Sequence, residues 1–483
     1  MSPYATAAEL AAALSQRKVS SAELTEAAIA RIDALDGPIN AVCVKTYDRA
    51  RGAARAADER LAMGETGPLL GVPMTVKESF NLTGAPTTWG FPAARDYCPA
   101  ADALAVERVQ RAGAVILGKT NVPVGLADWQ SYNEVYGVTN NPYDLARTPG
   151  GSSGGSSAAL AAGFGALSLG SDIGGSLRIP AHFCGVFAHK PSYDLCPARG
   201  HAPPGAPAGP GTIDLSVIGP MARSAEDLEA LLEVIAGPDE IDMGVGYRLA
   251  LPPARGEKLA DFRVLLLDNH SLAETETCVA QALQTLGAGL EQAGVKVSRR
   301  SDLFPDLVAN ARLYMRLLSA AFSSRWPDEL HAQMAAAAAR LGADDVSLFA
   351  EQVRGATLTH RAWFDADLRR KALRGQWRAF FRAFDAVIAP VTPTLAFPHD
   401  HEPDQNKRKL IVNGKPQDYF ANLLWAGVAT LPGLPATALP IGRSPQGLPI
   451  GAQIIGPWLE DRTPLRLAQL IAREFGGFSP PAL

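Results

Sequence analysis

The sequence contains few cysteines, and they form no pattern. There are five in 483 residues, an odd number, and no two make a CxxC pair. Disulfide-stapled secreted domains and cysteine-ligated zinc sites both need paired, closely spaced cysteines. We therefore expect reduced thiols, a cytoplasmic protein and no metal site. The five are Cys43, Cys98, Cys184, Cys196 and Cys278.

The chain also lacks a charge excess and a long apolar run. Its formal net charge is −4 with both signs scattered, which indicates no basic surface for nucleic acid or anionic lipid. The longest stretch of small apolar residues, 158–169, is interrupted by glycines and is shorter than the ~20 residues of a membrane span. No basic residue precedes the first apolar residues, which argues against a secretory signal. We expect neither a nucleic-acid nor a membrane partner.

What the chain does have is apolar material for one large core, because 47% of its residues are hydrophobic. Short β-prone runs at 71–77, 114–118 and 166–172 alternate with helical patterns, which is typical of an α/β fold. Strand-like runs return at 385–394 and 434–442, after a mostly helical stretch. We therefore expect one domain whose central sheet receives strands from both ends of the sequence.

Several local features divide this single domain, 1–483. Ser20 and Glu23 fit a capping box that begins a helix over 20–35, and Ser224 begins another that ends near Ile235. The Pro/Gly-rich stretch 197–211 must be a loop. The expected parts are an N-terminal helical segment (about 1–65), a core (about 66–240), a helical variable region (about 241–382) and C-terminal strands with a helix (383–483).

The most unusual segment is rich in glycine and serine. Residues 147–163 read RTPGGSSGGSSAALAAG, with four glycines and four serines among the eight residues 150–157. A flexible linker is the alternative interpretation. An apolar, helix-forming stretch follows at once, so we expect these glycines to lie inside a packed domain. There they would permit close backbone approach.

A second segment, LGSDIGGSLRIPAHFCG at 169–185, presents Ser176 directly after two glycines. Adjacent glycines permit a sharp turn, on which the backbone N–H groups of Ile173, Gly174, Gly175 and Ser176 can converge. Such donors are what the developing oxyanion of acyl transfer requires. Ser176 is therefore a candidate nucleophile, and it needs a base to remove its proton.

Lys77 is the attractive base, because it closes the apolar run 71–77. A lysine at the end of a buried strand loses solvation, which lowers its pKa toward the neutral form. Taken alone, Lys77 would be interpreted as a snorkelling lysine or as a partner of Glu78. No GxSxG elbow is present, and His182 and His189 are interpreted as structural.

These segments resemble the amidase signature family. GGSSGGSS (150–157) and GSDIGGSLR (170–178) together match its signature, and further motifs follow the family order over nearly the whole chain. The resemblance is weakest from about 240 to 380. The other motifs are GVPMTVKES (71–79), GKTN (118–121), NNPYD (140–144), HKPSY (189–193), GLPATALPIG (433–442) and GLPIGAQIIGP (447–457).

By position, the resemblance implies that Lys77 is the base, Ser152 a bridging serine with a cis peptide, and Ser176 the nucleophile. All three are intact, so an inactive relative is not expected. It also implies a mixed, twisted sheet flanked by helices, a homodimer, and no cofactor.

The substrate contacts are less sharply defined. Gln130, Ser153 and Arg178 are candidates, with Arg178 as an anchor for a substrate carboxylate. The first interpretation of Asp172 and Arg178 is structural, an ion pair that braces the nucleophile turn. The stretch 276–382 is expected to supply part of the pocket, although its aromatic residues are equally consistent with core positions. These aromatics are Tyr314, Trp326, Trp363 and Trp377.

The function implied is hydrolysis of small or aryl-substituted amides through an acyl-enzyme, with carbamates and esters open to the same chemistry. The alternative within the family is the glutaminase subunit of a tRNA-dependent amidotransferase. Against it, DWQSYNEVYG (128–137) and the loop 197–211 look more like the stand-alone, broad-specificity amidases.

Two short patterns suggest other classes of protein. GAVILGKT (113–120) formally matches a phosphate loop and would make this a nucleotide-binding protein, but its central residues favour a strand. His399 and His401 suggest a metal site, but no third ligand is evident in the sequence and a solvated loop is the better interpretation.

Overall fold

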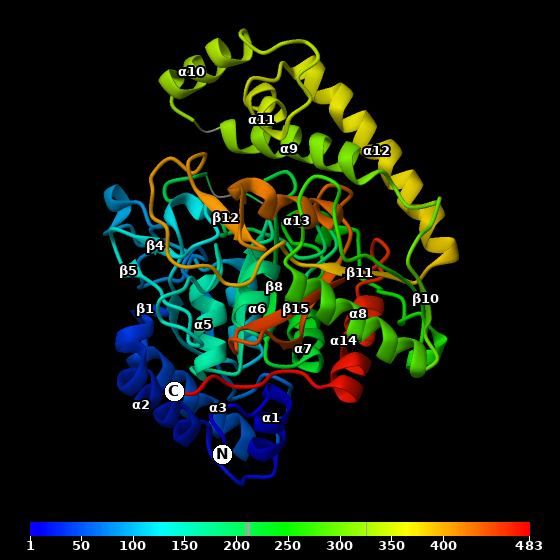
Figure 1. Cartoon of the computed structure of the whole chain (residues 1–483). Helices are drawn as coiled ribbons and strands as arrows, with labels where there is room; N and C mark the ends of the chain where they lie inside the picture. Colours follow the sequence, from blue (N-terminus) through cyan, green and yellow to red (C-terminus); the bar gives the residue numbers. More distant parts are fainter. Residues whose placement is uncertain (208, 210–212, 325) are drawn as a thin grey trace.

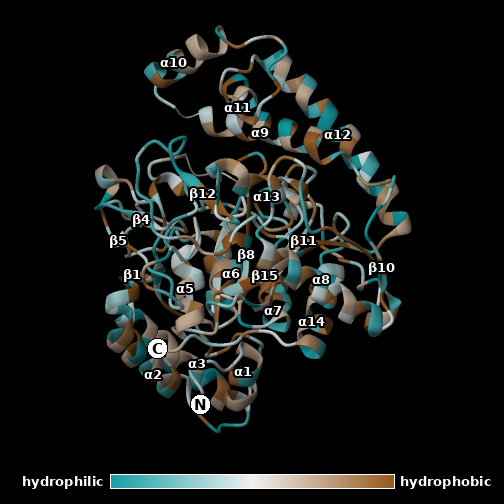
Figure 2. Ribbon diagram, viewed as in Figure 1, coloured by the Kyte–Doolittle hydropathy of each residue, from teal (hydrophilic) through white to brown (hydrophobic). Residues whose placement is uncertain are grey.

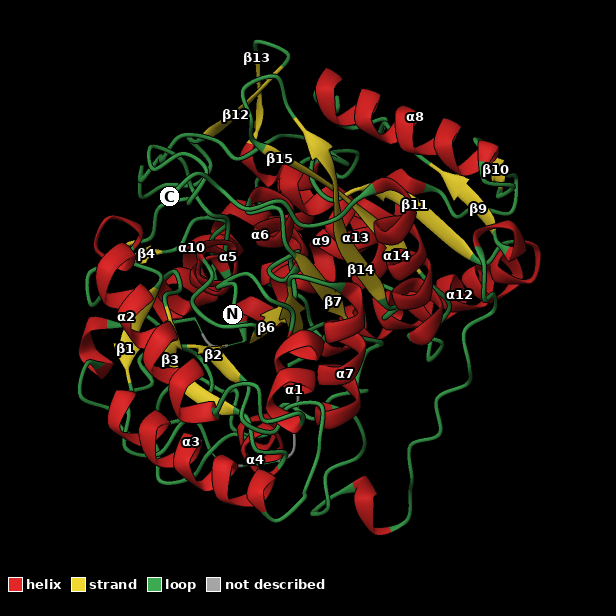
Figure 3. Cartoon of the chain, turned by 90° about the horizontal axis from the view of Figure 1, so that it is seen from below, coloured by secondary structure: helices red, strands yellow, loops and turns green. Residues whose placement is uncertain are grey.

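The apolar runs of the sequence form neighbouring strands of one large mixed sheet. The computed structural model describes all residues except 208, 210–212 and 325. In this described part the sheet has eleven strands, and it crosses the whole molecule from β1 to β10 (Figure 3). In spatial order they are β1 (Val42–Lys45), β3 (Val115–Thr120), β2 (Pro73–Lys77), β6 (Leu167–Asp172), β8 (Val217–Ala222), β7 (Phe187–Lys190), β14 (Ala436–Arg443), β15 (Pro449–Ile455), β11 (Ala386–Pro390), β9 (Arg263–Leu266) and β10 (Lys296–Ser298).

Strands from both ends of the sequence meet in this sheet, as the sequence predicts. The strands β3, β2 and β6 are parallel to one another, and so are β11, β9 and β10 at the other end. The central strands between these groups pair antiparallel. Two hairpins stand outside the sheet, β4 (Tyr132–Asn133) with β5 (Gly137–Val138) and β12 (Lys409–Val412) with β13 (Lys415–Asp418).

Helices cover both faces of the sheet. The predicted capping box is present, because Ser20 Oγ accepts from Glu23 N–H at 3.1 Å while Glu23 Oε2 accepts from Ser20 N–H at 2.8 Å. The α-helices of the described residues are α1 (Ala7–Ser15), α2 (Ser21–Ile39), α3 (Tyr47–Ala62), α4 (Leu104–Arg111), α5 (Gly154–Ala162), α6 (Arg178–Phe183), α7 (Ala225–Ile235), α8 (Thr277–Gln292), α9 (Leu307–Ser323), α10 (Asp328–Ala338), α11 (Leu348–Ala356), α12 (His360–Ala383), α13 (Asn422–Thr430) and α14 (Arg462–Phe475).

Successive side chains of a strand belong to different hydrophobic clusters, because they point to opposite faces of the sheet. In β11, Ala386 and Ile388 join the cluster that packs on α7, α8 and α14. Val387 and Ala389 join the cluster that packs on α6, α9, α12 and α13. The strands accordingly form the hydrophobic interior in Figure 2, whereas α10 and α12 carry mixed hydropathy.

The helices α9–α12 gather at one end of the molecule, away from α1–α3 and the two termini (Figure 1). No helix of the described residues combines the length and the apolar character that a bilayer crossing requires. The stretch 197–211 lacks helices and strands where it is described, as expected, while residues 208, 210 and 211 of it lie outside the described residues.

Candidate active site

Lys77 is the last residue of β2 and is fully buried between β3 and β6. Its Nζ donates to Ser152 Oγ at 2.7 Å and to Ser171 Oγ at 2.9 Å. Burial lowers the pKa of Lys77 to about 7, and the Asp172 carboxylate nearby acts in the opposite direction. A substantial fraction of neutral amine is therefore present near neutral pH, which is the form that can accept a proton.

Glu78 is not the partner of Lys77, although it is adjacent in sequence. The Glu78 carboxylate accepts from Trp89 N–H at 3.0 Å and from Tyr136 Oη at 3.0 Å. Glu78 lies in the turn after β2, and these bonds direct its carboxylate to Trp89 and Tyr136 and not to Lys77. Ser171, the second partner of Lys77, carries no signal in the sequence. The parallel pairing of β2 with β6 brings the two residues together, and that pairing is invisible in a single sequence.

Ser152 stands just before α5, in the glycine-rich segment. The peptide bond between Gly151 and Ser152 is cis, as the resemblance implies. A Cβ on Gly151 would lie 2.5 Å from Asp128 O, and one on Gly155 would lie 2.4 Å from Asn121 N. Every residue of α5 is buried. The glycines therefore serve close packing inside the domain, which excludes the linker interpretation.

Ser176 lies on the turn between β6 and α6, with 6% of its surface exposed. Two side chains hold the carbonyl groups of this turn: Tyr314 Oη donates to Ile173 O at 2.6 Å, and Trp129 Nε1 donates to Gly174 O at 2.9 Å. Because the N–H of a peptide unit points opposite to the carbonyl of the same unit, these bonds also fix the direction of the N–H groups of Gly174 and Gly175. The turn beside Ser176 is thus held in place from two sides.

One member of the expected donor set is engaged elsewhere. Gly175 N–H donates to Asp172 Oδ1 at 2.9 Å, which corrects the prediction that it faces an oxyanion. The N–H groups of Ile173, Gly174 and Ser176 have no partner among the described residues. These three remain available to a bound oxygen.

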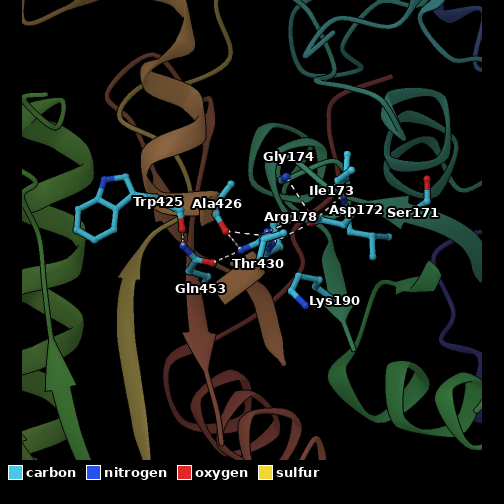
Figure 4. Close-up of polar contacts among 12 residues, drawn as sticks. Ser171, Asp172, Ile173, Gly174, Arg178, Lys190, Trp425, Ala426, Thr430 and Gln453 are labelled. Atoms are coloured by element: carbon cyan, nitrogen blue, oxygen red, sulfur yellow. Dashed lines mark hydrogen bonds and ion pairs between the residues drawn. The ribbon is translucent and has the colours of Figure 1, made fainter. Parts of the chain in front are cut away.

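Asp172 and Arg178 form the buried ion pair considered from the sequence (Figure 4). Arg178 Nε and Nη2 bind the two Asp172 oxygens at 2.9 and 3.0 Å. Its remaining donors go to Ala426 O, Gln453 Oε1 and Thr430 Oγ1. The guanidinium has no donor left and is 1% exposed, so the hypothesis that Arg178 anchors a substrate carboxylate is wrong.

Two other residues that were expected to contact the substrate form hydrogen bonds within the protein instead. Ser153 Oγ donates to Ser171 O at 3.3 Å and is fully buried. Gln130 is fully buried too, with Nε2 donating to Asp400 O at 2.6 Å and Oε1 accepting from Asp400 N–H at 2.9 Å. Both predictions therefore need correction, because each side chain is consumed by backbone groups of the protein itself.

A cavity of about 190 Å³ opens beside Ser176. Its walls are mostly apolar and come from the nucleophile turn, from 126–129, from α9, α11 and α13, and from residues 405 and 420. Of the four aromatic residues named from the sequence, Trp326 lines the cavity, whereas Tyr314, Trp363 and Trp377 do not. The lining residues are Leu126, Ala127, Asp128, Trp129, Ile173, Gly174, Ser176, Met315, Leu318, Ser319, Phe322, Trp326, Gln352, Gln405, Phe420 and Leu423.

The edge of this cavity is clamped by a distant segment, 398–420. Arg408 Nη1 binds Asp128 Oδ2 at 2.6 Å, and Tyr419 Oη donates to Asp128 Oδ1 at 2.6 Å. Arg408 also reaches Tyr132 Oη at 2.8 Å. This clamp could not be found from the sequence, because its partners lie nearly three hundred residues apart and carry no local motif.

The phosphate-loop pattern and three of the histidines considered from the sequence have structural roles. GAVILGKT includes all of β3, so it does not form the flexible turn of a phosphate loop. His182 is held between Thr394 O and Gly451 N–H, and burial lowers its pKa to about 4. His189 bonds Thr437 and Asp461. His401 stacks on Tyr132 with ring centroids 3.9 Å apart.

Comparisons with known proteins identify a family and several similar chains. A family model described as Amidase matches residues 23–465. The chain is 35% identical to a component of the glutamyl-tRNA(Gln) amidotransferase of Anaeromyxobacter sp. (strain K), over 98% of this chain and 96% of that protein. It is 32% identical to fatty-acid amide hydrolase 2-A of Danio rerio, over 99% and 90%. The chain also shares its fold with a solved structure that is described as an inhibitor-bound vestigial protein complex bearing on the origins of an s-triazine catabolic enzyme. The TM-score is 0.81 and the identity 30%, over 98% of this chain and 99% of that one.

Proposed function

Because the chain belongs to the amidase signature family, we propose that it hydrolyses small, apolar or aryl-substituted carboxylic amides with Ser176 as nucleophile. One observation carries the proposal: a buried Lys77 Nζ lies 2.7 Å from Ser152 Oγ, next to the turn that presents Ser176 to an apolar cavity. A neutral amine bonded to a serine is a general base, and the turn supplies donors for an oxyanion.

In the proposed reaction, Ser176 Oγ attacks the substrate carbonyl while its proton moves to Ser152 Oγ, which passes its own proton to Lys77 Nζ. The N–H groups of Ile173, Gly174 and Ser176 bind the oxyanion. Ser152 then protonates the leaving nitrogen as the C–N bond breaks, and regains a proton from Lys77. Water attacks the acyl-enzyme by the same proton path and releases the acid. Carbamates and esters are open to the same steps.

The second candidate is the glutaminase subunit of a tRNA-dependent amidotransferase, which the 35% identical relative favours. The cavity argues against it. No lysine, arginine or histidine is among its described lining residues, and the one carboxylate among them, Asp128, is neutralised by Arg408. The charged ammonium and carboxylate of glutamine would lose hydration there without gaining a counter-ion.

Hydrolysis of a panel of anilides, benzamides, carbamates and glutamine tests the proposal. The purified wild type is expected to turn over aryl amides without a partner protein, and Lys77→Ala is expected to lose that turnover. Glutamine as the sole substrate would establish the second candidate instead. Aryl-amide turnover that survives in Lys77→Ala would overturn the lysine base.

A further inference from the structure

Two polar side chains interrupt the apolar wall of the cavity beside Ser176. Asp128 and Gln405 are also polar, but they are occupied: Asp128 binds Arg408, and Gln405 Nε2 donates to Ala127 O at 2.9 Å. Ser319 on α9 and Gln352 on α11 have no hydrogen-bond partner among the residues that the structure describes. Ser319 is 6% exposed and Gln352 is partly exposed, and both lie at the surface of the cavity.

Ser319 lies away from the nucleophile turn along α9. Tyr314, five residues earlier on the same helix, touches the turn through its bond to Ile173 O. Five residues of α-helix advance about 7.5 Å along the axis. The helix α11 packs closely on α9, because a Cβ on Gly355 would lie 2.3 Å from Arg316 O. Ser319 and Gln352 therefore lie on the helical wall of the cavity, whereas Ile173, Gly174 and Ser176 form its wall at the nucleophile turn.

Polar groups in an apolar pocket discriminate strongly between ligands. A ligand that fills the cavity removes the polar groups of its wall from water, so a ligand that leaves them unpaired is disfavoured relative to one that binds them. Among its described lining residues the cavity has no free charged group, which disfavours a charged substituent. A neutral hydroxyl, amine or carboxamide satisfies both conditions.

We infer that the cavity receives the acyl group of the substrate, and that Ser319 and Gln352 select acyl groups with a neutral hydrogen-bonding substituent at the end remote from the carbonyl. This inference rests on the proposed function, and it names the substrate class that the same site prefers. A benzoyl group with a 4-hydroxyl or 4-amino substituent has this shape. Ser319 and Gln352 are specificity-determining residues in this account, with no part in bond cleavage.

Paired amides test the selection. The ratio of kcat/KM for 4-hydroxybenzamide to that for 4-methylbenzamide is measured in wild type, Ser319→Ala and Gln352→Met. We expect the 4-hydroxy compound to be preferred by wild type, and each substitution to lower the ratio about fivefold to tenfold, mainly through KM. Gln376→Met on α12, outside this cavity, is the matched control and should leave the ratio unchanged.

A second pair of amides tests whether the substituent is recognised on the acyl side or on the amine side of the bond. The acetanilides with 4-hydroxyl and 4-methyl groups carry the same difference on the amine side, and Gln352→Met should not alter their ratio. Amide turnover with benzamide ratios that neither variant changes would overturn the inference and leave the proposed function standing. A variant effect confined to the acetanilides would overturn the acyl assignment. Absence of any amide turnover by wild type would overturn both.

Discussion

The sheet around Lys77 and the group of helices α9, α11 and α12 differ in how completely their polar groups are hydrogen-bonded within the protein. In the first region Lys77, Asp172 and Arg178 are at most 1% exposed, and each is bonded to protein groups. In the second, both amide atoms of buried Asn310 lack a partner within the described chain, and Phe364 is 48% exposed. This contrast fits the proposal that the sheet around Lys77 carries the chemistry and that residues of α9 and α11 set the selectivity.

The greatest loss of activity is expected from substitutions at Lys77 and Ser176. Lys77→Ala and Ser176→Ala should each lower kcat/KM for the best amide at least about 10⁴-fold, because each removes a group on which the whole proton path depends. Phe364→Ala on α12 should stay within about twofold of wild type. Circular dichroism and thermal melting should show all three folded. Retention of a tenth of the activity by either core variant would contradict the assignment.

Ser152→Ala should lower kcat about 10³-fold, a smaller loss, since water can replace part of a proton relay. Combined with Lys77→Ala it should add little, because residues that act as one unit are not additive. Steady-state kinetics of the two single variants and the double variant form the cycle. Fully additive losses would show that Ser152 and Lys77 act independently.

The ion pair offers a comparison of stability. Arg178→Met leaves Asp172 buried and uncompensated, so it should lower the free energy of unfolding by about 3–5 kcal/mol. Arg369→Met removes an arginine from the exposed face of α12 and should change it by less than about 0.5 kcal/mol. Urea unfolding of both variants measures the difference. Equal effects would mean that the two regions do not differ in the way described.

The smallest effect comes from two asparagines. Asn310→Leu should raise the free energy of unfolding by about 1 kcal/mol, because it removes an amide that lacks partners within the described chain. Asn133→Leu should lower it by about 2 kcal/mol or more, since Asn133 Nδ2 binds Asn121 Oδ1 and Val122 O while its Oδ1 accepts two N–H groups. Destabilisation by both substitutions would show that Asn310 is satisfied in solution.

Much of the catalytic region could be predicted from the sequence, because its determinants are local. The apolar runs that become β2 and β6, the glycines around Ser152 and the turn at Ser176 each carry a pattern within a few residues. The fold class follows from the same runs. Asp172 and Arg178 are six residues apart, which is why their ion pair is within reach of sequence reasoning.

The pocket could not be predicted in the same way. The sequence suggests Gln130 as a substrate contact, but its amide is consumed by the backbone of Asp400, 270 residues away. The clamp from Arg408 to Asp128 spans 280 residues. Ser319 and Gln352 are ordinary helix residues whose significance depends on which face the packing turns toward the cavity. Pairings over such distances leave no trace in one sequence.

The activation of Ser176 by neutral Lys77 can be followed through the rate at which a fluorophosphonate labels Ser176 at different pH values. Mass spectrometry of the intact protein and its peptides measures this rate and locates the adduct. Because the pKa of Lys77 is lowered to about 7, the neutral amine predominates above that pH and is lost below it. The account predicts one adduct, on Ser176, a rate that falls about tenfold per pH unit below 7, and no labelling of Lys77→Ala. An adduct on another residue, or a rate that peaks below pH 6, would contradict it.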